Sequence, residues 1–136
     1  MVDRGELIPL PQGKEPTLRV IPMPADANHT GDIFGGWIMS QVDLAGSVSA
    51  VRLAQGRVAT VAVNSFVFRQ PVLVGDLVSF YAEVLKVGRT SITVGVEVYA
   101  QRRPDKDLCV KVTEATLTYV AVDDSRQPRL VVAQPG

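Results

Sequence analysis

The spacing of hydrophobic residues changes near Gly56 and divides the chain into a helical part and a β-rich part. Before Gly56, the segment Gly35–Gln55 places apolar residues at helical intervals, so it is the strong helix candidate of the chain. After Gly56, apolar residues alternate with polar ones or form β-branched runs, which are typical of strands. We expect one strand before the helix, at Thr17–Ile21, and four after it, at about Val58–Arg69, Leu77–Val87, Ser91–Arg102 and Cys109–Val122.

The predicted helix is apolar on nearly all sides, because no charged residue other than Asp43 occurs between Ile33 and Val51. A helix of this kind is expected to be buried. A carboxylate in such surroundings is costly unless hydrogen bonds or a helix terminus offset its burial. We therefore interpret Asp43 as a functional residue. Gly35 and Gly36 would open the helix, and their free N–H groups could hold a developing negative charge.

The predicted strands have one dry and one wet face. In Leu77–Val87, for example, Val78 and Phe80 alternate with Ser79 and Tyr81, as in an antiparallel sheet packed on one side. The links between the later strands are short, which favours a meander of hairpins. The simplest fold is of the α+β class, with one curved antiparallel sheet wrapped around one long central helix. Such a sheet leaves edge strands exposed, so we expect pairing with a second copy.

The chain is interpreted as one domain at residues 17–129, with an irregular N-terminal arm at 1–16 and a C-terminal tail at 130–136. Lys+Arg and Asp+Glu are balanced at 14 each, so the charge does not indicate binding to nucleic acid or anionic lipid. The apolar stretch around Asp43 is not interpreted as a membrane span, because an Asp at mid-membrane costs about 2.5–3.5 kcal/mol. The N-terminal residues contain no apolar run of signal-peptide length. We expect a cytoplasmic protein with no membrane partner.

The single cysteine, Cys109, and the single histidine, His29, exclude several kinds of site. An intramolecular disulfide is impossible, and a Cys/His zinc site would lack ligands, so no metal is expected. A Ser-His-Asp triad would need His29, which lies in a predicted loop, and the chain has no nucleophile-elbow or phosphate-loop motif. Cys109 is interpreted as an ordinary buried residue at the start of a strand.

One segment, residues 24–46, combines Asn28, the run GDIFGG at 31–36, Met39 and Asp43. This arrangement resembles the signature of the hot-dog-fold acyl-CoA thioesterases, and most closely the short bacterial YciA type. The resemblance extends over about residues 17–129 and implies the hot-dog fold, a five-stranded sheet around one helix that pairs into a homodimer. Members often assemble further into hexamers, as trimers of dimers. Later segments agree with it: 68–72 (FRQPV), 74–76 (VGD), 86–91 (KVGRTS), 113–115 (TEA) and 119–123 (YVAVD).

By this resemblance, the protein is expected to hydrolyse acyl-CoA to a free carboxylic acid and CoA. Asp43 matches the helix-borne acid of the family, which acts as general base or as nucleophile, and the residues leave both roles open. Gly35 and Gly36, with Gly36 favoured, are expected to offer N–H groups to the thioester oxygen. Asn28 matches the polar residue that orients the water or the carbonyl group, and it can come from the partner subunit.

Coenzyme A carries a 3′-phosphate and a pyrophosphate, so cations are expected at the mouth of the site. No metal and no redox cofactor is implied, since CoA enters only as part of the substrate and product. The candidates for CoA binding are Lys86, Gly88, Arg89, Thr90 and Ser91 in a predicted hairpin, and Arg69 at the end of a predicted strand.

Two alternatives stay open at this point. The chain could be a non-catalytic acyl-CoA-binding protein of the same fold, or another acyl-CoA enzyme such as a dehydratase. Dehydratases that resemble this family rely on a His and an acid, whereas the helix here carries Asp43 with no His nearby, which favours hydrolysis. An inert binder would have no reason to keep an acid in an otherwise uncharged helix.

Overall fold

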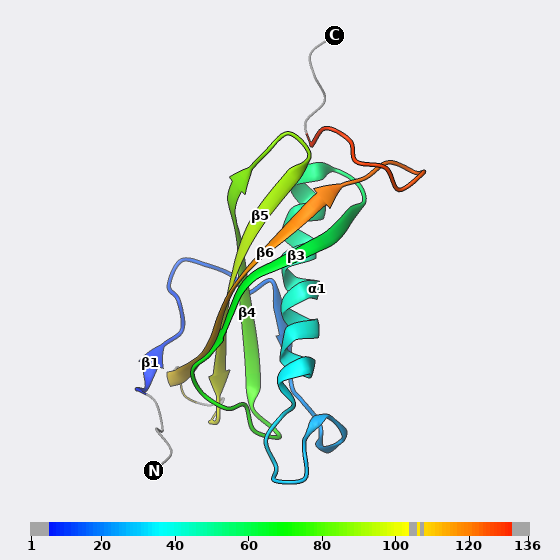
Figure 1. Ribbon diagram of the computed structural model, residues 1–136. Coiled ribbons are helices and arrows are strands. Elements are labelled where there is room, and N and C mark those ends of the chain that lie inside the picture. The colour runs from blue at the N-terminus through cyan, green and yellow to red at the C-terminus, as the bar shows by residue number, and fades with distance from the viewer. Residues whose placement is uncertain (1–5, 104–105, 107, 132–136) are drawn as a thin grey trace.

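A single long helix lies along one face of a twisted antiparallel sheet (Figure 1). The structure is a computed structural model that describes residues 6–103, 106 and 108–131; the rest of the predicted arm and tail, 1–5 and 132–136, lies outside the described residues. The helix and the five predicted strands are all present, and their ends differ from the predicted ends by at most one residue. In chain order the elements are β1 (Ile8–Pro9), β2 (Leu18–Val20), the 3-10 helix η1 (Pro24–Asp26), α1 (Gly35–Ala54), β3 (Val58–Phe68), β4 (Leu77–Val87), β5 (Ser91–Gln101) and β6 (Leu108–Ala121).

The strands lie side by side in the order β2-β4-β5-β6, and the other edge of β6 pairs with both β1 and β3. β1 pairs with the start of β6, where Ile8 is opposite Cys109, and β3 pairs with the rest, where Phe68 is opposite Thr113. The expected meander is thus confirmed for β4, β5 and β6 and is wrong for β3, which does not neighbour β4. The two-residue strand β1 also lies within the arm that was expected to be irregular.

The short link between β3 and β4 crosses the end of the sheet instead of folding back as a hairpin. Val72 in this link is buried, and its carbonyl oxygen accepts a hydrogen bond from the N–H group of Ile33 (2.9 Å). The carboxylate of Asp76 accepts another from the N–H group of Leu73 (2.9 Å). The first contact holds the link against the loop before α1, and the second closes a turn within the link. A short link therefore does not make a hairpin here, because its backbone bonds to that loop and β3 pairs with β6 instead of β4.

The hydrophobic core lies between α1 and the sheet. Gly46 allows the helix to approach β6 closely, because a Cβ atom at this position would overlap the hydroxyl group of Tyr119. Among the described residues, no helix has the length and hydrophobicity needed to cross a membrane. The buried side chains of α1 are Ile38, Val42, Ala45, Ala50 and Ala54, and they share one core with side chains of the sheet that include Phe80, Ile92, Val94, Leu117 and Tyr119.

The side of α1 that faces away from the sheet is apolar and exposed. Leu44 is 55% exposed and Met39 is 41% exposed. The expectation of a helix buried on nearly all sides is therefore wrong for the single chain, which buries one side only. β3 exposes Val61 and Val63 as well, and within the part of the chain that the structure describes its second edge pairs with no strand. A free edge next to exposed apolar side chains is typical of a surface that associates.

The opposite face of the sheet is partly covered by the N-terminal arm. Tyr81, Tyr99 and Cys109 form a second buried cluster, against which Ile8 packs. The prediction of a wet face is therefore wrong for Tyr81 and also for Ser79, which are both buried, because alternation within a strand does not reveal what a distant arm covers. The thiol group of Cys109 donates a hydrogen bond to the carbonyl oxygen of Ile8 (3.3 Å). Its interpretation as an ordinary buried residue is confirmed.

Candidate active site

Asp43 lies midway along α1 and is half-buried. Its Oδ1 atom accepts a hydrogen bond from Oγ1 of Thr60 on β3 (2.8 Å) and one from the hydroxyl group of Tyr119 on β6 (3.1 Å). Its Oδ2 atom accepts no hydrogen bond from any described residue. The carboxylate therefore has one oxygen held in place and one that is free to meet a substrate or a water molecule.

Thr60 and Tyr119 are functional candidates that the sequence did not single out. The hydroxyl group of Tyr119 has a raised pKa, because burial and the neighbouring Asp43 carboxylate disfavour the phenolate. It therefore stays protonated and can donate. One signal for Thr60 was available in the sequence, since it is the first hydroxyl group in the apolar run that follows the helix. Its contact with a helix residue depends on how β3 packs, which the sequence does not give.

The N-terminus of α1 presents backbone N–H groups, as predicted for Gly35 and Gly36. Neither N–H group has a hydrogen-bond acceptor among the described residues, as is usual in a first helical turn. The two positions differ in their surroundings. A Cβ atom at Gly35 would lie 3.2 Å from Cζ of Phe68, whereas one at Gly36 would meet nothing within 4 Å. Gly36 is thus the more open of the two, and its role in binding the thioester oxygen stays a prediction.

Asp43 and Gly36 do not meet at one point within a single chain. They lie on the same helix, and their seven-residue separation corresponds to about 10 Å along its axis. A general base and an oxyanion donor must each come within about 3 Å of the reacting group. One chain therefore supplies the predicted carboxylate and the predicted oxyanion donors at separate places.

Asn28 shapes the loop that precedes α1. Its Oδ1 atom accepts hydrogen bonds from the N–H group of Thr30 (2.9 Å), from the hydroxyl group of Thr30 (2.8 Å) and from the N–H group of Asp32 (3.1 Å). Asn often stabilises a turn in this way. This structural role is clear in the single chain, and the predicted role in orienting a water or carbonyl group stays a prediction.

A hollow of about 370 Å³ lies beside the start of α1, and its walls include Gly35, Phe68 and Arg69. The structure thus brings two predicted site residues, Gly35 and Arg69, to one place. The guanidinium group of Arg69 forms an ion pair with Glu114 on β6 (3.0 Å). A phosphate group that uses Arg69 would have to compete with this exposed carboxylate.

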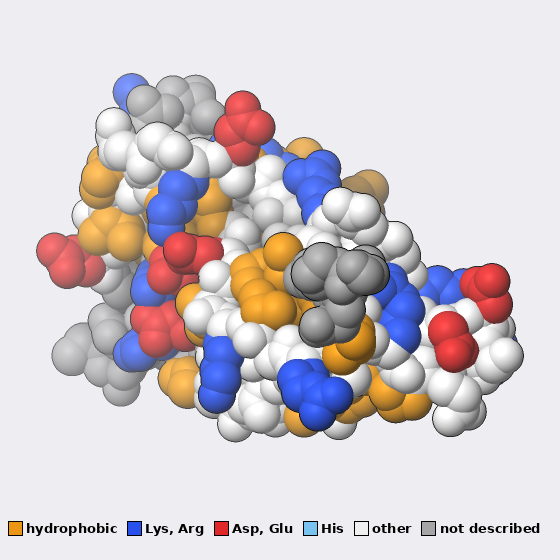
Figure 2. Space-filling view, turned by 90° about the horizontal axis from the view of Figure 1, so that it is seen from above, with side chains coloured by type: hydrophobic (Ala, Val, Ile, Leu, Met, Phe, Trp, Pro, Cys, Tyr) orange, Lys and Arg blue, Asp and Glu red, His pale blue; other side chains and the backbone are white. Residues whose placement is uncertain are grey.

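The hairpin between β4 and β5 lies near the other end of α1, far from Arg69 (Figure 1). Viewed from that end, the molecule shows several Lys and Arg side chains separated by exposed apolar ones (Figure 2). Lys86 and Arg89 are exposed, and the N–H group of Gly88 closes the turn on the carbonyl oxygen of Ser91 (2.8 Å). Within one chain, the hairpin and Arg69 cannot hold the same CoA, so the two predicted sets are separate candidates.

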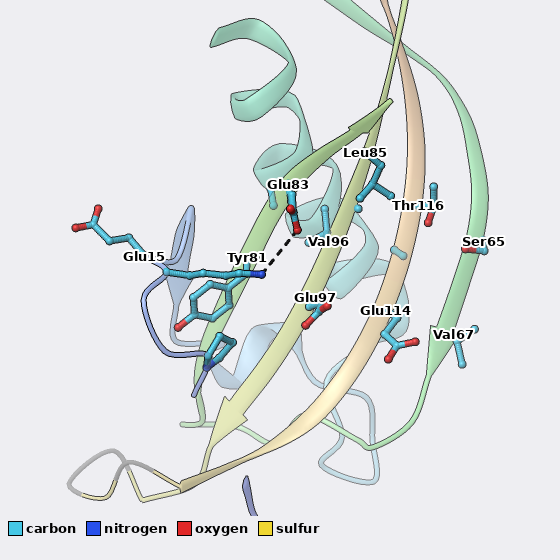
Figure 3. Close-up of a pocket in the computed structure, with 15 residues that line it drawn as sticks. Glu15, Ser65, Val67, Tyr81, Glu83, Leu85, Val96, Glu97, Glu114 and Thr116 are labelled. Carbon is cyan, nitrogen blue, oxygen red and sulfur yellow. Dashed lines mark ion pairs between the residues drawn. The ribbon is translucent and has the colours of Figure 1, made fainter. Parts of the chain in front are cut away.

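A larger hollow of about 570 Å³ lies on the outer face of the sheet (Figure 3). Glu83, Glu97 and Glu114 line it, and Lys14 of the arm pairs with Glu83 (3.7 Å). Grouped carboxylates repel the phosphates of CoA, and none of the predicted catalytic residues lies in its walls. We therefore place the candidate active site on the helix side of the sheet. Among the described residues, no group of three or more His, Cys, Asp or Glu could hold a metal ion.

Comparison with known proteins adds independent information. A family model described as the thioesterase superfamily matches residues 30–106. The acyl-CoA thioester hydrolase YciA of Salmonella typhimurium is 47% identical over 126 residues, which cover 91% of this chain and 94% of the relative. A hexameric hotdog fold thioesterase of Campylobacter jejuni has a TM-score of 0.83 at 44% identity, covering 90% of this chain and 93% of its own.

A more distant structural relative is the acyl-CoA hydrolase of Staphylococcus aureus, solved in complex with butyryl coenzyme A and coenzyme A. It is 27% identical, with a TM-score of 0.78, and the similarity covers 83% of this chain and 68% of the relative. Structures of that hydrolase with an aspartate or a threonine replaced by alanine are also known. These two residue types are also the ones that share the Thr60–Asp43 hydrogen bond here.

Proposed function

The chain belongs to the thioesterase superfamily and is an acyl-CoA thioester hydrolase of the hot-dog fold, and we propose that Asp43 is its catalytic carboxylate. The geometry of Asp43 carries this proposal. Two hydroxyl groups hold Oδ1, and Oδ2 accepts no hydrogen bond from the described residues. A reacting carboxylate needs both properties, because one oxygen must be fixed and the other must reach the substrate.

In the proposed reaction, Oδ2 of Asp43 starts the attack on the carbonyl carbon of the thioester. As a general base it accepts a proton from a water molecule, whose oxygen forms the new bond to carbon. As a nucleophile it forms that bond itself, and water then cleaves the resulting anhydride. In both routes the carbonyl oxygen becomes negative and accepts a hydrogen bond from Gly36 N–H. The C–S bond then breaks and CoA leaves as a thiolate, and in the nucleophilic route this step forms the anhydride that water cleaves last.

We further propose that a complete site needs two chains. Asp43 and Gly36 are about 10 Å apart along one helix, so the oxyanion donors beside Asp43 come from a partner, as does Asn28. The free edge of β3 and the exposed apolar side of α1, with Leu44 and Val48, support antiparallel pairing of two β3 strands in a homodimer. The hexameric relative from Campylobacter jejuni supports a further assembly into a trimer of dimers.

The binding of CoA is assigned to cations at the edges of this assembly. Two sets of cations are candidates, the hairpin with Lys86, Arg89, Thr90 and Ser91 and the separate Arg69. They lie at opposite ends of one chain, so one CoA would use them together only across subunits.

The proposed chemistry assigns attack and charge stabilisation to protein groups and water, and no metal ion is required. Activity is therefore expected to survive dialysis against EDTA. The cytoplasmic location stays a prediction.

The test uses purified protein, acyl-CoAs of several chain lengths and a thiol-reactive dye that detects released CoA. Asp43→Asn keeps an oxygen for Thr60 and Tyr119 but can neither take up a proton nor attack, so kcat is expected to fall by at least about two orders of magnitude. The matched control is Asp124→Asn, since Asp124 is exposed and its side chain forms no hydrogen bond or ion pair with the described residues. Full activity in a correctly folded Asp43→Asn protein would move the chemistry to another residue.

A further inference from the structure

Tyr119 on β6 is a fully buried side chain that reaches into the turn of α1 around Asp43. It has no exposed surface, and its hydroxyl group lies 2.9 Å from the carbonyl oxygen of Asp43 and 3.1 Å from Oδ1 of the same residue. The space for this hydroxyl group exists because residue 46 is a glycine. Tyr119 and Gly46 therefore form a fitted pair directly beneath the proposed catalytic carboxylate.

Both acceptors of this hydroxyl group belong to one residue, and this has a mechanical consequence. A donor that bridges the backbone oxygen and the side-chain oxygen of Asp43 fixes the χ angles of that side chain relative to its own helix. Rotation of the carboxylate would break the bond to Oδ1. The Oδ2 atom, which accepts no hydrogen bond from the described residues, is then held in one direction.

We propose that Tyr119 is a positioning residue that fixes the orientation of the Asp43 carboxylate for thioester hydrolysis, with Gly46 providing the space for its hydroxyl group. This inference rests on the proposed catalytic function of Asp43. It assigns a role to Tyr119 that differs from that of Thr60. Thr60 is exposed in the single chain and connects the carboxylate to the position of β3, whereas the ring of Tyr119 is fixed in the core. No water can replace the hydroxyl group of Tyr119 without a rearrangement of the core.

A purely structural role of Tyr119 would need fewer hydrogen-bond acceptors than its hydroxyl group has. A buried tyrosine needs one acceptor for its hydroxyl group, and the carbonyl oxygen of Asp43 would be enough. The second acceptor is an oxygen of the carboxylate that reacts in the proposed mechanism. Burial and this carboxylate also raise the pKa of Tyr119, so the donor remains protonated over the pH range in which the enzyme would work.

The first test is Tyr119→Phe in the assembled protein, assayed with the best acyl-CoA of the panel. The ring still fills the core, but Asp43 loses one of its two hydroxyl donors. We expect kcat to fall about 10- to 100-fold, because a small misplacement of a reacting group has effects of this size, while KM changes less than about two-fold. The matched control is Tyr99→Phe. It also removes a buried tyrosine hydroxyl, one that donates to Glu97, and its kcat is expected to equal that of the wild type.

A second test separates positioning from packing. In Gly46→Ala the new methyl group overlaps the hydroxyl group of Tyr119, so both the melting temperature and kcat are expected to fall. In the double variant Gly46→Ala/Tyr119→Phe the hydroxyl group is gone and the melting temperature recovers in part. The kcat of the double variant is expected to stay as low as that of Tyr119→Phe. Recovery of kcat together with the melting temperature would overturn the inference.

The outcomes also separate this inference from the proposed function. If Asp43→Asn is inactive and Tyr119→Phe has the kcat of the wild type, the positioning role is wrong and the catalytic role of Asp43 stands. If Asp43→Asn is fully active, the proposed function itself fails. A drop in kcat for Tyr119→Phe, with KM and the helical circular dichroism signal preserved, supports both.

Discussion

The hydroxyl group of Thr60 on β3 donates a hydrogen bond of 2.8 Å to Oδ1 of Asp43, 17 residues earlier on α1. This bond connects the proposed catalytic residue to β3, a strand with one edge unpaired among the described residues. It also makes the carboxylate sensitive to the position of β3. Any contact that fixes β3, including pairing with a second copy, would therefore also fix Asp43.

The exchange of Thr60 for valine tests this connection. Thr60→Val keeps the β-branched shape and removes the donor, so we expect kcat to fall about ten-fold or more, the effect of a slightly misplaced reacting group. Thr60→Ser restores the hydroxyl group and is expected to recover most of the activity. Steady-state kinetics of the two variants, at equal oligomeric state, provide the measurement. Equal kcat values for serine and valine at this position would show that the hydrogen bond does not matter for the reaction.

The two glycines at the start of α1 are expected to respond differently to alanine. Gly36→Ala places its methyl group in open space and improves helix propensity, so the protein should be as stable as the wild type or more stable by up to about 1 kcal/mol. Its kcat should nevertheless fall, because the methyl group hinders the approach of a thioester to the N–H group. Gly35→Ala should be less stable than Gly36→Ala, since its methyl group would lie 3.2 Å from Cζ of Phe68 and the ring has to shift.

Denaturant unfolding and kinetics on the same samples check this difference. The informative result is a Gly36→Ala protein that is stable but slow. A Gly36→Ala protein with unchanged kcat would show that its N–H group is not approached by substrate, and the oxyanion donor would have to be sought elsewhere.

The sequence was sufficient to predict the elements and the residue at the centre of the site. Asp43 was found because a lone charge in an apolar helix is expensive, and this cost can be recognised from composition alone. The ends of α1 and of the long strands were found because apolar periodicity and turn residues are local signals. Each of these inferences needs only residues that are neighbours in the chain.

The contacts that complete the site could not be predicted in the same way. Thr60 and Tyr119 lie opposite each other on the neighbouring strands β3 and β6, and their shared contact with Asp43 depends on sheet order. The short link around Val72 suggested a hairpin, but it crosses the end of the sheet and puts β3 beside β6. Likewise, Tyr81 follows the alternation of an exposed position, and the arm residue Ile8 helps to cover the cluster to which it belongs. Long-range packing decided all of these cases.

The buried carboxylate of Asp76 should make folding stability depend on pH. Burial raises the pKa of Asp76, and the N–H group of Leu73 and the guanidinium group of Arg102 only partly oppose this effect. Because the folded pKa lies above the unfolded value of 3.8, the stability from this group is present at low pH and is lost as the pH rises through the folded pKa. Asp76→Asn does not titrate and still has an oxygen for Leu73.

We therefore expect the stability of Asp76→Asn, relative to the wild type, to increase from acid to neutral pH. Urea unfolding of both proteins at several pH values, starting just below 3.8, gives this difference directly. The same protein concentration must be used throughout, because assembly contributes to apparent stability. A constant difference across this range would mean that the Asp76 carboxyl group titrates alike in the folded and unfolded protein.

The proposed two-chain site makes its own prediction for mixed assemblies. Asp43→Asn removes the carboxylate, and Gly36→Val blocks the oxyanion donor, so each variant alone is expected to be nearly inactive. In a mixed dimer, one of the two sites would combine the Asp43 of one chain with the Gly36 of the other, and both of these residues would be unchanged. Random pairing makes half of the dimers mixed, so about a quarter of the wild-type activity should return if each site combines residues from both chains.

Co-expression of the two variants with different affinity tags gives the random mixture for this measurement, and tandem purification then isolates the mixed dimers, in which about half of the wild-type activity is expected because one of the two sites is intact. The matched control combines Asp43→Asn with Tyr119→Phe. These two residues contact each other within one chain, so exchanging chains cannot bring the missing group to the site. In a mixed dimer of that pair every site lacks either the Asp43 carboxylate or the Tyr119 hydroxyl group beside it, so its activity is expected not to exceed that of Tyr119→Phe alone. Activity that returns only for the Asp43→Asn and Gly36→Val pair would place the carboxylate and the N–H donor on opposite chains. If no activity returns in verified mixed dimers, each chain must carry a complete site, and the 10 Å separation along α1 would have to be bridged in another way.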